Sequence, residues 1–340
     1  MIFDCFAFFN ELDLLELRLN TLNEVVDKFV LVEATRNFNN KEKPLYFNEN
    51  KERFKKFEDK IIHIIVDEFP PEIEIEEWTI ENYQRNQISR GLENCKDDDI
   101  ILISDLDEIP RPELIKEKYN PDKIIAFDCD VFTYFLNNYT VGYNWTHGTK
   151  MLSYKNFKSL LDGEDFSKSY GIVKQYCKGT NATTIRLYYG NKQKHIHKGG
   201  WHFSYIGTKE AILDKYHSIC EGNIKLTQKE CLKLINSNKF LNTYYLVPVE
   251  IDKTFPKYIQ ENKEKYKDFI ITDYKYNINS KKLKLTYAVR YFLDNIFAIK
   301  DEIKGKTKRK KIIILGLKMS FKIKQNKRST NAIWIYKTKN

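Results

Sequence analysis

The chain has 340 residues, enough for one large α/β domain or for a catalytic domain with an appendage. Hydrophobic residues make up 42% and charged residues 31%, a composition that excludes wholesale disorder. The net charge is +10, but residues 304–340 contain thirteen Lys or Arg and no Asp or Glu, so subtracting them leaves −3 for residues 1–303. This slightly acidic main part disfavours a nucleic-acid binder and confines the basic charge to one end of the chain.

Cysteine spacing and the N-terminal residues bear on the cellular compartment. The six cysteines are scattered without paired spacing, which predicts free thiols in a reducing compartment. The start, MIFDCFAFFNELD, lacks the basic region of a signal peptide. No run approaches the roughly 18 apolar residues that a membrane-spanning helix needs. We therefore expect a cytoplasmic protein.

The first hundred residues predict an alternation of strands and helices. Apolar runs predict strands at 2–9, 28–34, 60–69 and 97–112. Leucines spaced by three and four predict a helix after Asn10, which stands at the N-cap position, and a second helix is predicted at 81–92. This order predicts a mostly parallel central sheet with helices on both faces. In such sheets ligands bind beyond the carboxyl ends of the strands.

The remainder predicts further elements and an extension. Strands are expected at 123–136, 148–154 and 194–207, a helix at 208–220, and mixed helix and loop to about residue 270. Beyond this point the pattern weakens into a Lys-rich segment interrupted by IIILGL at 312–317. We expect a catalytic domain at 1–270 and a basic C-terminal extension at 271–340.

An acidic motif lies near the C-terminal end of the strand predicted at 97–112. Asp105-Leu106-Asp107 follows the apolar run IILIS, and carboxylates two apart on an extended strand point to the same side. Both can then meet one Mn²⁺ or Mg²⁺, ions that prefer carboxylate and diphosphate oxygens. Such an ion would offset the charge of a leaving nucleoside diphosphate. The position of the pair therefore predicts a metal and diphosphate site, with a solvated strand-end turn as the plainer alternative.

Other polar residues could join this site. Arg85, with Asn86 beside it, could reach a diphosphate, and Glu33 at a strand end could bind a nucleoside; ordinary surface or turn contacts explain all three equally well. In Gly199-Gly200-Trp201-His202 the aromatic ring offers a stacking face. His202 could ligate the metal, contact phosphate or be a buried, satisfied histidine.

His195 and His197 are also two residues apart on a predicted strand. Metal ligation by this pair is conceivable, but a polar strand edge is the favoured interpretation.

Taken together, several segments resemble glycosyltransferase family 17. They are FFNELDLLELRL, DKFVLVEATRNF, KPLYFNENKERF, the QRN of the second helix, ISDLDEIPRP and GGWHFSYIG, in order over about residues 1–266. The resemblance implies a GT-A type fold, a UDP-sugar donor, expected to carry N-acetylglucosamine, a divalent metal, and inversion at the anomeric carbon. Asp105 and Asp107 match the acidic metal and donor motif of the family. Arg85 and Asn86 match its Q-R-N segment, and Trp201 and His202 match its G-W-H segment.

We expect the chain to differ from the animal Golgi members in lacking their membrane anchor and stem. It resembles the short members of the family instead, which implies a cell-surface or lipid-linked saccharide as acceptor. Inversion by direct displacement requires a carboxylate base for the acceptor hydroxyl. Asp165, in the Gly-containing segment DGEDF, is the favoured candidate. Glu108 is the second candidate, although it could instead brace the acidic motif; Glu164, Asp130 and Glu210 are also plausibly placed.

The basic segment at 304–328 interleaves basic and apolar residues. Such a segment can lie on an anionic membrane surface, where each basic residue contributes about 1 kcal/mol. We expect a peripheral association with the inner membrane face; a solvated extension or small β-hairpin is the alternative.

Two other functions are alternatives to a glycosyltransferase. Haloacid-dehalogenase-type phosphatases also use D-x-D after a strand, but on their first strand, whereas here the motif begins at residue 105 and continues as Glu108-Ile109-Pro110. A non-enzymatic module that binds an anionic surface would rely on the basic extension alone, and the acidic main part speaks against nucleic acid as its ligand.

Overall fold

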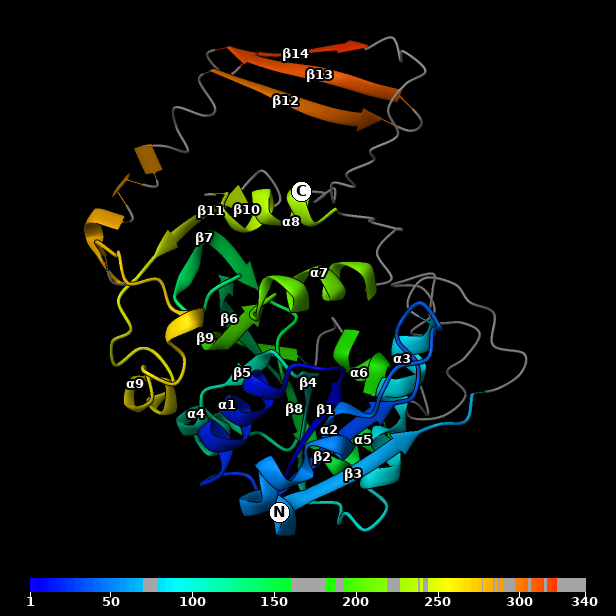
Figure 1. Cartoon of the computed structure of the whole chain (residues 1–340). Helices are drawn as coiled ribbons and strands as arrows, with labels where there is room; N and C mark the ends of the chain where they lie inside the picture. Colours follow the sequence, from blue (N-terminus) through cyan, green and yellow to red (C-terminus); the bar gives the residue numbers. More distant parts are fainter. Residues whose placement is uncertain are drawn as a thin grey trace.

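The computed structural model describes residues 1–69, 79–159, 182–187, 193–218, 227–237, 239–240, 244–276, 278–283, 285–286, 288–289, 297–304, 307–314 and 317–322. Within these residues, eleven strands form one sheet flanked by helices, and three more form a second sheet (Figure 1). The predicted α/β class with a helix-flanked central sheet is confirmed.

The N-terminal half of the main sheet is parallel. Its strands lie in the order β3-β2-β1-β4, with β1 at Ile2–Phe8, β2 at Lys28–Ala34, β3 at Ile61–Val66 and β4 at Ile100–Asp105. β1 pairs in parallel with β2 on one side and β4 on the other, and it is buried along nearly its whole length. A strand covered on both faces requires a continuous apolar run, which IFDCFAF supplies.

The other half of the sheet is mixed. β8 (Lys150–Ser153) lies antiparallel between β4 and β6 (Ile124–Thr133), followed by β7 (Asn138–Trp145), β11 (Tyr244–Pro248) and β10 (Lys239–Phe240). The four residues between β6 and β7 are too few for a crossover, so these two strands pair antiparallel. β9 (Gln193–Ser204) pairs in parallel with β6 and antiparallel with β5 (Glu108–Pro110).

Helices cover both faces of the sheet. Their bounds are α1 Leu12–Leu22, α2 Tyr46–Glu49, α3 Thr79–Asn86, α4 Pro112–Lys118, α5 Tyr154–Ser159, α6 Ala182–Leu187, α7 Lys209–Ser218, α8 Gln228–Ile235 and α9 Lys257–Glu261; 3₁₀ turns lie at η1 Lys51–Lys60, η2 Gln87–Gly91 and η4 Lys267–Phe269. The helix predicted at 81–92 is therefore α3 followed by η2.

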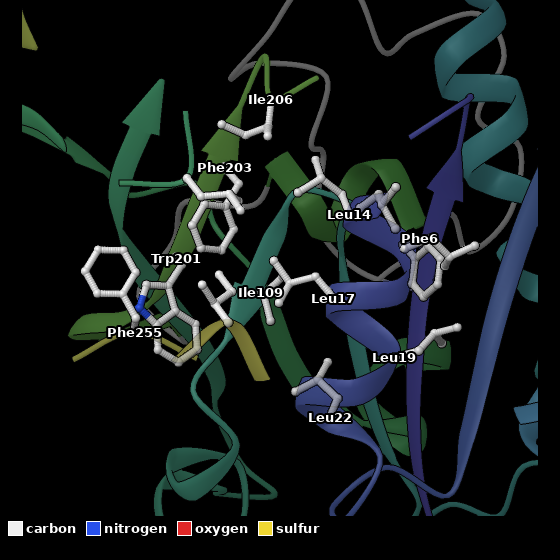
Figure 2. Close-up of a cluster of buried hydrophobic side chains, with 14 of the residues drawn as sticks. Phe6, Leu14, Leu17, Leu19, Leu22, Ile109, Trp201, Phe203, Ile206 and Phe255 are labelled. Carbon is white, nitrogen blue, oxygen red and sulfur yellow. The ribbon is translucent and has the colours of Figure 1, made fainter. Parts of the chain in front are cut away.

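Helix α1 packs its leucines against the sheet. Figure 2 shows Leu14, Leu17 and Leu22 of α1 in one apolar cluster that extends to Trp201 and Phe255. The helix begins at Leu12 with Glu11 at its N-cap, so the prediction of Asn10 as N-cap is wrong. The Asn10 side chain instead donates a hydrogen bond to Asp214 of α7.

The basic extension contains the second sheet. β12 (Phe297–Lys304), β13 (Thr307–Ile314) and β14 (Leu317–Lys322) pair antiparallel in that order. Across the described ranges, no helix combines the length and apolar character needed to cross a bilayer. The predicted membrane-surface contact of residues 304–328 stays a prediction.

Candidate active site

The acidic loop lies where β4 ends. Asp105 is the last residue of β4, Leu106 and Asp107 form a turn, and β5 begins at Glu108. The expectation that an extended strand carries both Asp105 and Asp107 is therefore wrong, because the strand stops between them. Each carboxylate instead has its own set of cationic partners.

Asp105 is held by two arginines. Its Oδ1 accepts a hydrogen bond from Arg85 Nη2 at 2.9 Å, and its Oδ2 accepts one from Arg186 Nη2 at 2.8 Å. Arg85 comes from α3, where Glu81 also accepts from its guanidinium, and Arg186 comes from α6. Burial alone would raise the pKa of Asp105, but the attraction of Arg186 and Arg85 outweighs it and holds that pKa well below its usual range.

Glu108 lies beneath Asp105. Its Oε2 accepts a hydrogen bond from the backbone N–H of Asp105 at 3.1 Å, and its Oε1 accepts from Arg186 Nη2 at 2.6 Å and from the indole N–H of Trp145. The residue is fully buried, and burial, with a contribution from the nearby Asp105 charge, raises its pKa to about 7. This carboxylate therefore links the acidic loop to α6 and β7.

Arg18 of α1 supports the loop from below. It is fully buried and bonds Asp4 of β1 through Nε and Nη2, while Nη2 also donates to Ser104 at 2.6 Å. Its Nη1 donates to three carbonyl oxygens of the loop at 2.9 to 3.0 Å. These carbonyls belong to Asp105, Leu106 and Glu108. One guanidinium thus fixes the backbone path of the whole motif.

Asp107 has a different environment. Its Oδ2 accepts a hydrogen bond from Lys215 Nζ of α7 at 3.0 Å, and its Oδ1 lies 3.6 Å from Nε2 of His202 on β9. The same Lys215 ammonium lies 3.2 Å from Glu11 Oε1. Burial opposes ionisation of Asp107, but the charges of Lys215 and His202 prevail and lower its pKa.

Three side chains around the loop have a buried nitrogen without a hydrogen-bond partner in the described part of the chain. These atoms are Nε of Arg85, Nε of Arg186 and Nδ1 of His202. An unpartnered buried polar atom costs about 1–3 kcal/mol, and two of these three nitrogens belong to the arginines that bond Asp105.

Asp107 and His202 fit a divalent cation better than Asp105 does. Oδ1 of Asp107 and Nε2 of His202 lie 3.6 Å apart, close enough to ligate the same ion, whereas both oxygens of Asp105 accept hydrogen bonds from arginines. Among the residues that the structure describes, no three His, Cys, Asp or Glu side chains are grouped to hold a metal by themselves. A cation here would complete its shell with diphosphate oxygens and water, which suits Mg²⁺ and Mn²⁺.

Three residues predicted to bind the donor lie elsewhere. Glu33 is fully buried and accepts hydrogen bonds from the N–H groups of Phe47 and Asn48 at the start of α2. Trp201 is 3% exposed, and its indole donates to the Thr254 carbonyl at 2.9 Å, so it belongs to the core and not to the site. Asn86 accepts from the backbone N–H of Thr183, which joins α3 to α6.

The His195 and His197 pair contacts one acid. Nδ1 of each lies 2.6 and 2.7 Å, respectively, from the carboxylate of Asp128, which is fully buried in β6. This arrangement agrees with the favoured interpretation of a polar strand. Asp165 and Glu164 lie outside the described residues.

Three functional candidates were missed by sequence reasoning: Arg18, Arg186 and Lys215. Arg186 and Lys215 reach the loop from positions 81 and 108 residues away, among 57 Lys and Arg in the chain. Arg18 carried a signal, because it lies three residues after Leu15 and four before Leu22, on the apolar face of α1.

Comparisons with known proteins place this site in a family. The chain aligns with the beta-1,4-mannosyl-glycoprotein 4-beta-N-acetylglucosaminyltransferases of Rattus norvegicus and Homo sapiens at 27% identity over 228 residues. The alignment covers 63% of this chain and 42% of each relative, so the chain matches less than half of their length. The family model of glycosyltransferase family 17 matches residues 1–185, a range that contains β4, the acidic loop and Arg85. The chain belongs to glycosyltransferase family 17.

Proposed function

We propose that the chain transfers a sugar, N-acetylglucosamine first among the candidates, from a UDP-sugar to a saccharide hydroxyl with inversion. The main observation in support is the acidic loop at the carboxyl end of β4. Two arginines, a lysine and a histidine surround this loop. In a family 17 chain this combination suits a diphosphate that must be bound and then released. The relatives are named as N-acetylglucosaminyltransferases, which supports N-acetylglucosamine as the transferred sugar.

The proposal includes Mn²⁺ or Mg²⁺ at Asp107 and His202, with Asp105 next to it in the loop. When bound, the cation would neutralise charge on the leaving diphosphate. The chain itself supplies a rigid loop, because Arg18 fixes its carbonyls and Arg85 and Arg186 fix Asp105. A preorganised arrangement of this kind costs no rearrangement at the moment of reaction.

The proposed chemistry is one direct displacement. The acceptor hydroxyl gives its proton to a carboxylate, its oxygen bonds to the anomeric carbon, and the bond from that carbon to the diphosphate breaks as UDP leaves. Asp165 remains the proposed base. Glu108 suits a bracing role better, since three donors already engage its oxygens.

For the acceptor, we extend the proposal to a cell-surface or lipid-linked saccharide. The basic residues at 304–328 support this choice, because they would hold a cytoplasmic enzyme close to an anionic membrane.

Isothermal titration of the full chain with UDP-N-acetylglucosamine, UDP-glucose and UDP-galactose, each with and without Mn²⁺, tests the donor and the metal together. We expect Mn²⁺-dependent binding of the nucleotide, tightest for UDP-N-acetylglucosamine. An absence of nucleotide binding under all conditions would overturn the proposal. Equal binding with and without divalent cation would remove the metal from it.

A further inference from the structure

Helix α7 crosses the carboxyl ends of three neighbouring parallel strands. Asn10, just after β1, donates to Asp214 Oδ2 at 3.1 Å, and Asn39, in the connection after β2, donates to the His217 carbonyl at 2.6 Å. Lys215 reaches Asp107, just after β4. Figure 1 shows α7 beyond the ends of these strands. Since ligands of such sheets bind at these ends, α7 covers the place expected for the donor nucleotide.

Lys215 is the cation by which α7 contacts the acidic loop. Its ammonium lies between Asp107 Oδ2 at 3.0 Å and Glu11 Oε1 at 3.2 Å, and 5.5 Å from the ring centre of Tyr205. Asp107 and Glu11 are both largely buried, so without Lys215 two carboxylates would be left without this counter-charge. Lys215 therefore acts as the counter-ion of Asp107 and Glu11.

A divalent cation and Lys215 would compete for the same acid. Asp107 is the carboxylate closest to His202, and any cation bound by that pair would approach the ammonium on the other Asp107 oxygen. Like charges at this separation repel, so either the cation binds weakly or the lysine moves. A lysine can move without leaving the site, because its charge stands on a flexible four-carbon stem.

We propose that Lys215 is a donor-binding residue: its ammonium, which neutralises Asp107, transfers to the diphosphate when the metal and nucleotide bind. The inference rests on the proposed function, since it takes a nucleoside diphosphate as ligand. It adds a specific exchange, in which Asp107 gives up an ammonium and gains the divalent cation, while the ammonium gains phosphate oxygens.

Two measurable effects of opposite sign follow for Lys215→Gln in the full chain. Mn²⁺ alone should bind more tightly than to the wild type, by about ten-fold, because its competitor is gone. UDP in saturating Mn²⁺ should bind more weakly, also by about ten-fold, because one charged phosphate contact is lost. If Lys215 only supported the fold, its substitution would not raise the affinity for Mn²⁺ while lowering the affinity for UDP.

The experiment measures Mn²⁺ binding by electron paramagnetic resonance of the free ion and UDP binding by isothermal titration. Lys209→Gln is the matched control, because it removes the same charge from an exposed position of the same helix, and it should leave both affinities unchanged. Lys215→Met, which keeps the apolar stem, carries the same expectations if the glutamine variant does not fold.

The outcomes separate the two proposals. If the wild type binds UDP with Mn²⁺ but Lys215→Gln has unchanged or weaker Mn²⁺ affinity, or unchanged UDP affinity, the role of Lys215 is overturned and the proposed function stands. If the wild type binds no UDP under any condition, the proposed function fails and the role of Lys215 at the diphosphate fails with it.

Discussion

The two aspartates of the D-x-D motif, separated by Leu106, are held by different chemistry. Asp105 bonds two buried guanidinium groups, and the carbonyls of its loop bond a third, that of Arg18. Asp107 faces an ammonium on a separate helix and an imidazole 3.6 Å away. Guanidinium groups make planar, multiple hydrogen bonds, whereas an ammonium is a compact charge on a flexible stem. The Asp105 side is thus built to stay in place, and the Asp107 side is built to exchange partners.

The largest effect is expected from Asp107→Asn. Turnover should fall by about 10³-fold, and Mn²⁺ should no longer strengthen UDP binding, because the exchanging carboxylate is lost. Titration with and without Mn²⁺ and a sugar-transfer assay measure both. Asp97→Asn, at an exposed acid, is the control and should change neither. Retained Mn²⁺-dependent UDP binding in Asp107→Asn would contradict the division of roles between the two aspartates.

Arg18→Ala tests the Asp105 side of the loop. The change leaves the fully buried Asp4 carboxylate without its partner, so the free energy of unfolding should fall by about 3–5 kcal/mol. Urea unfolding measures it. Arg53→Ala is the control, because Arg53 of η1 pairs with Asp13 and Glu16 of α1 at a partly exposed position, and its loss should cost no more than about 1 kcal/mol. Equal losses in the two variants would show that the buried arginine is not a special support.

Glu108→Gln tests the Asp105 side through the pH dependence of the free energy of unfolding. Burial raises the pKa of Glu108 from 4.5 to about 7, so we expect native Glu108 to keep its proton to a higher pH than an ordinary glutamate does. A raised pKa stabilises the fold at low pH, and that stability is lost as pH rises from about 4.5 through 7. The glutamine cannot titrate, so its free energy of unfolding should fall less over this range, by about 2 kcal/mol.

Unfolding by urea at pH 5 and pH 8 measures this difference, and Glu93→Gln, at an exposed acid, should behave like the wild type. A wild-type pH dependence retained in Glu108→Gln would mean that Glu108 stays ionised between its donors.

Much of the fold could be predicted because β1 to β4 are each encoded locally. The apolar runs of β1, β2 and β4 are long enough for burial on both faces, and connections that contain helices permit parallel pairing. The antiparallel half depends on contacts between distant segments, such as β6 with β9, and no local pattern records which strand pairs with which.

The sequence predicts only those residues of the site that lie in or next to the strand that carries the acidic motif. Asp105 and Asp107 are marked by their place after a buried strand, and Arg85 by its helix just before that strand. Arg186 and Lys215 belong to the site only because the fold brings α6 and α7 to the loop. Trp201 could have been set aside from sequence, since neighbours on a strand face opposite sides and only one of Trp201 and His202 can face the loop.

The smallest effect is expected from Trp201→Phe. This change tests whether β9 contributes only His202, and not Trp201, to the Asp107 side of the loop. Phenylalanine keeps most of the packing and loses the hydrogen bond to Thr254, so stability should fall by about 1–2 kcal/mol. UDP affinity in Mn²⁺ should stay unchanged, as titration would show. His202→Ala, one residue along the strand, should weaken Mn²⁺-dependent binding with little loss of stability. The opposite pattern would place Trp201 at the donor and assign His202 to the core.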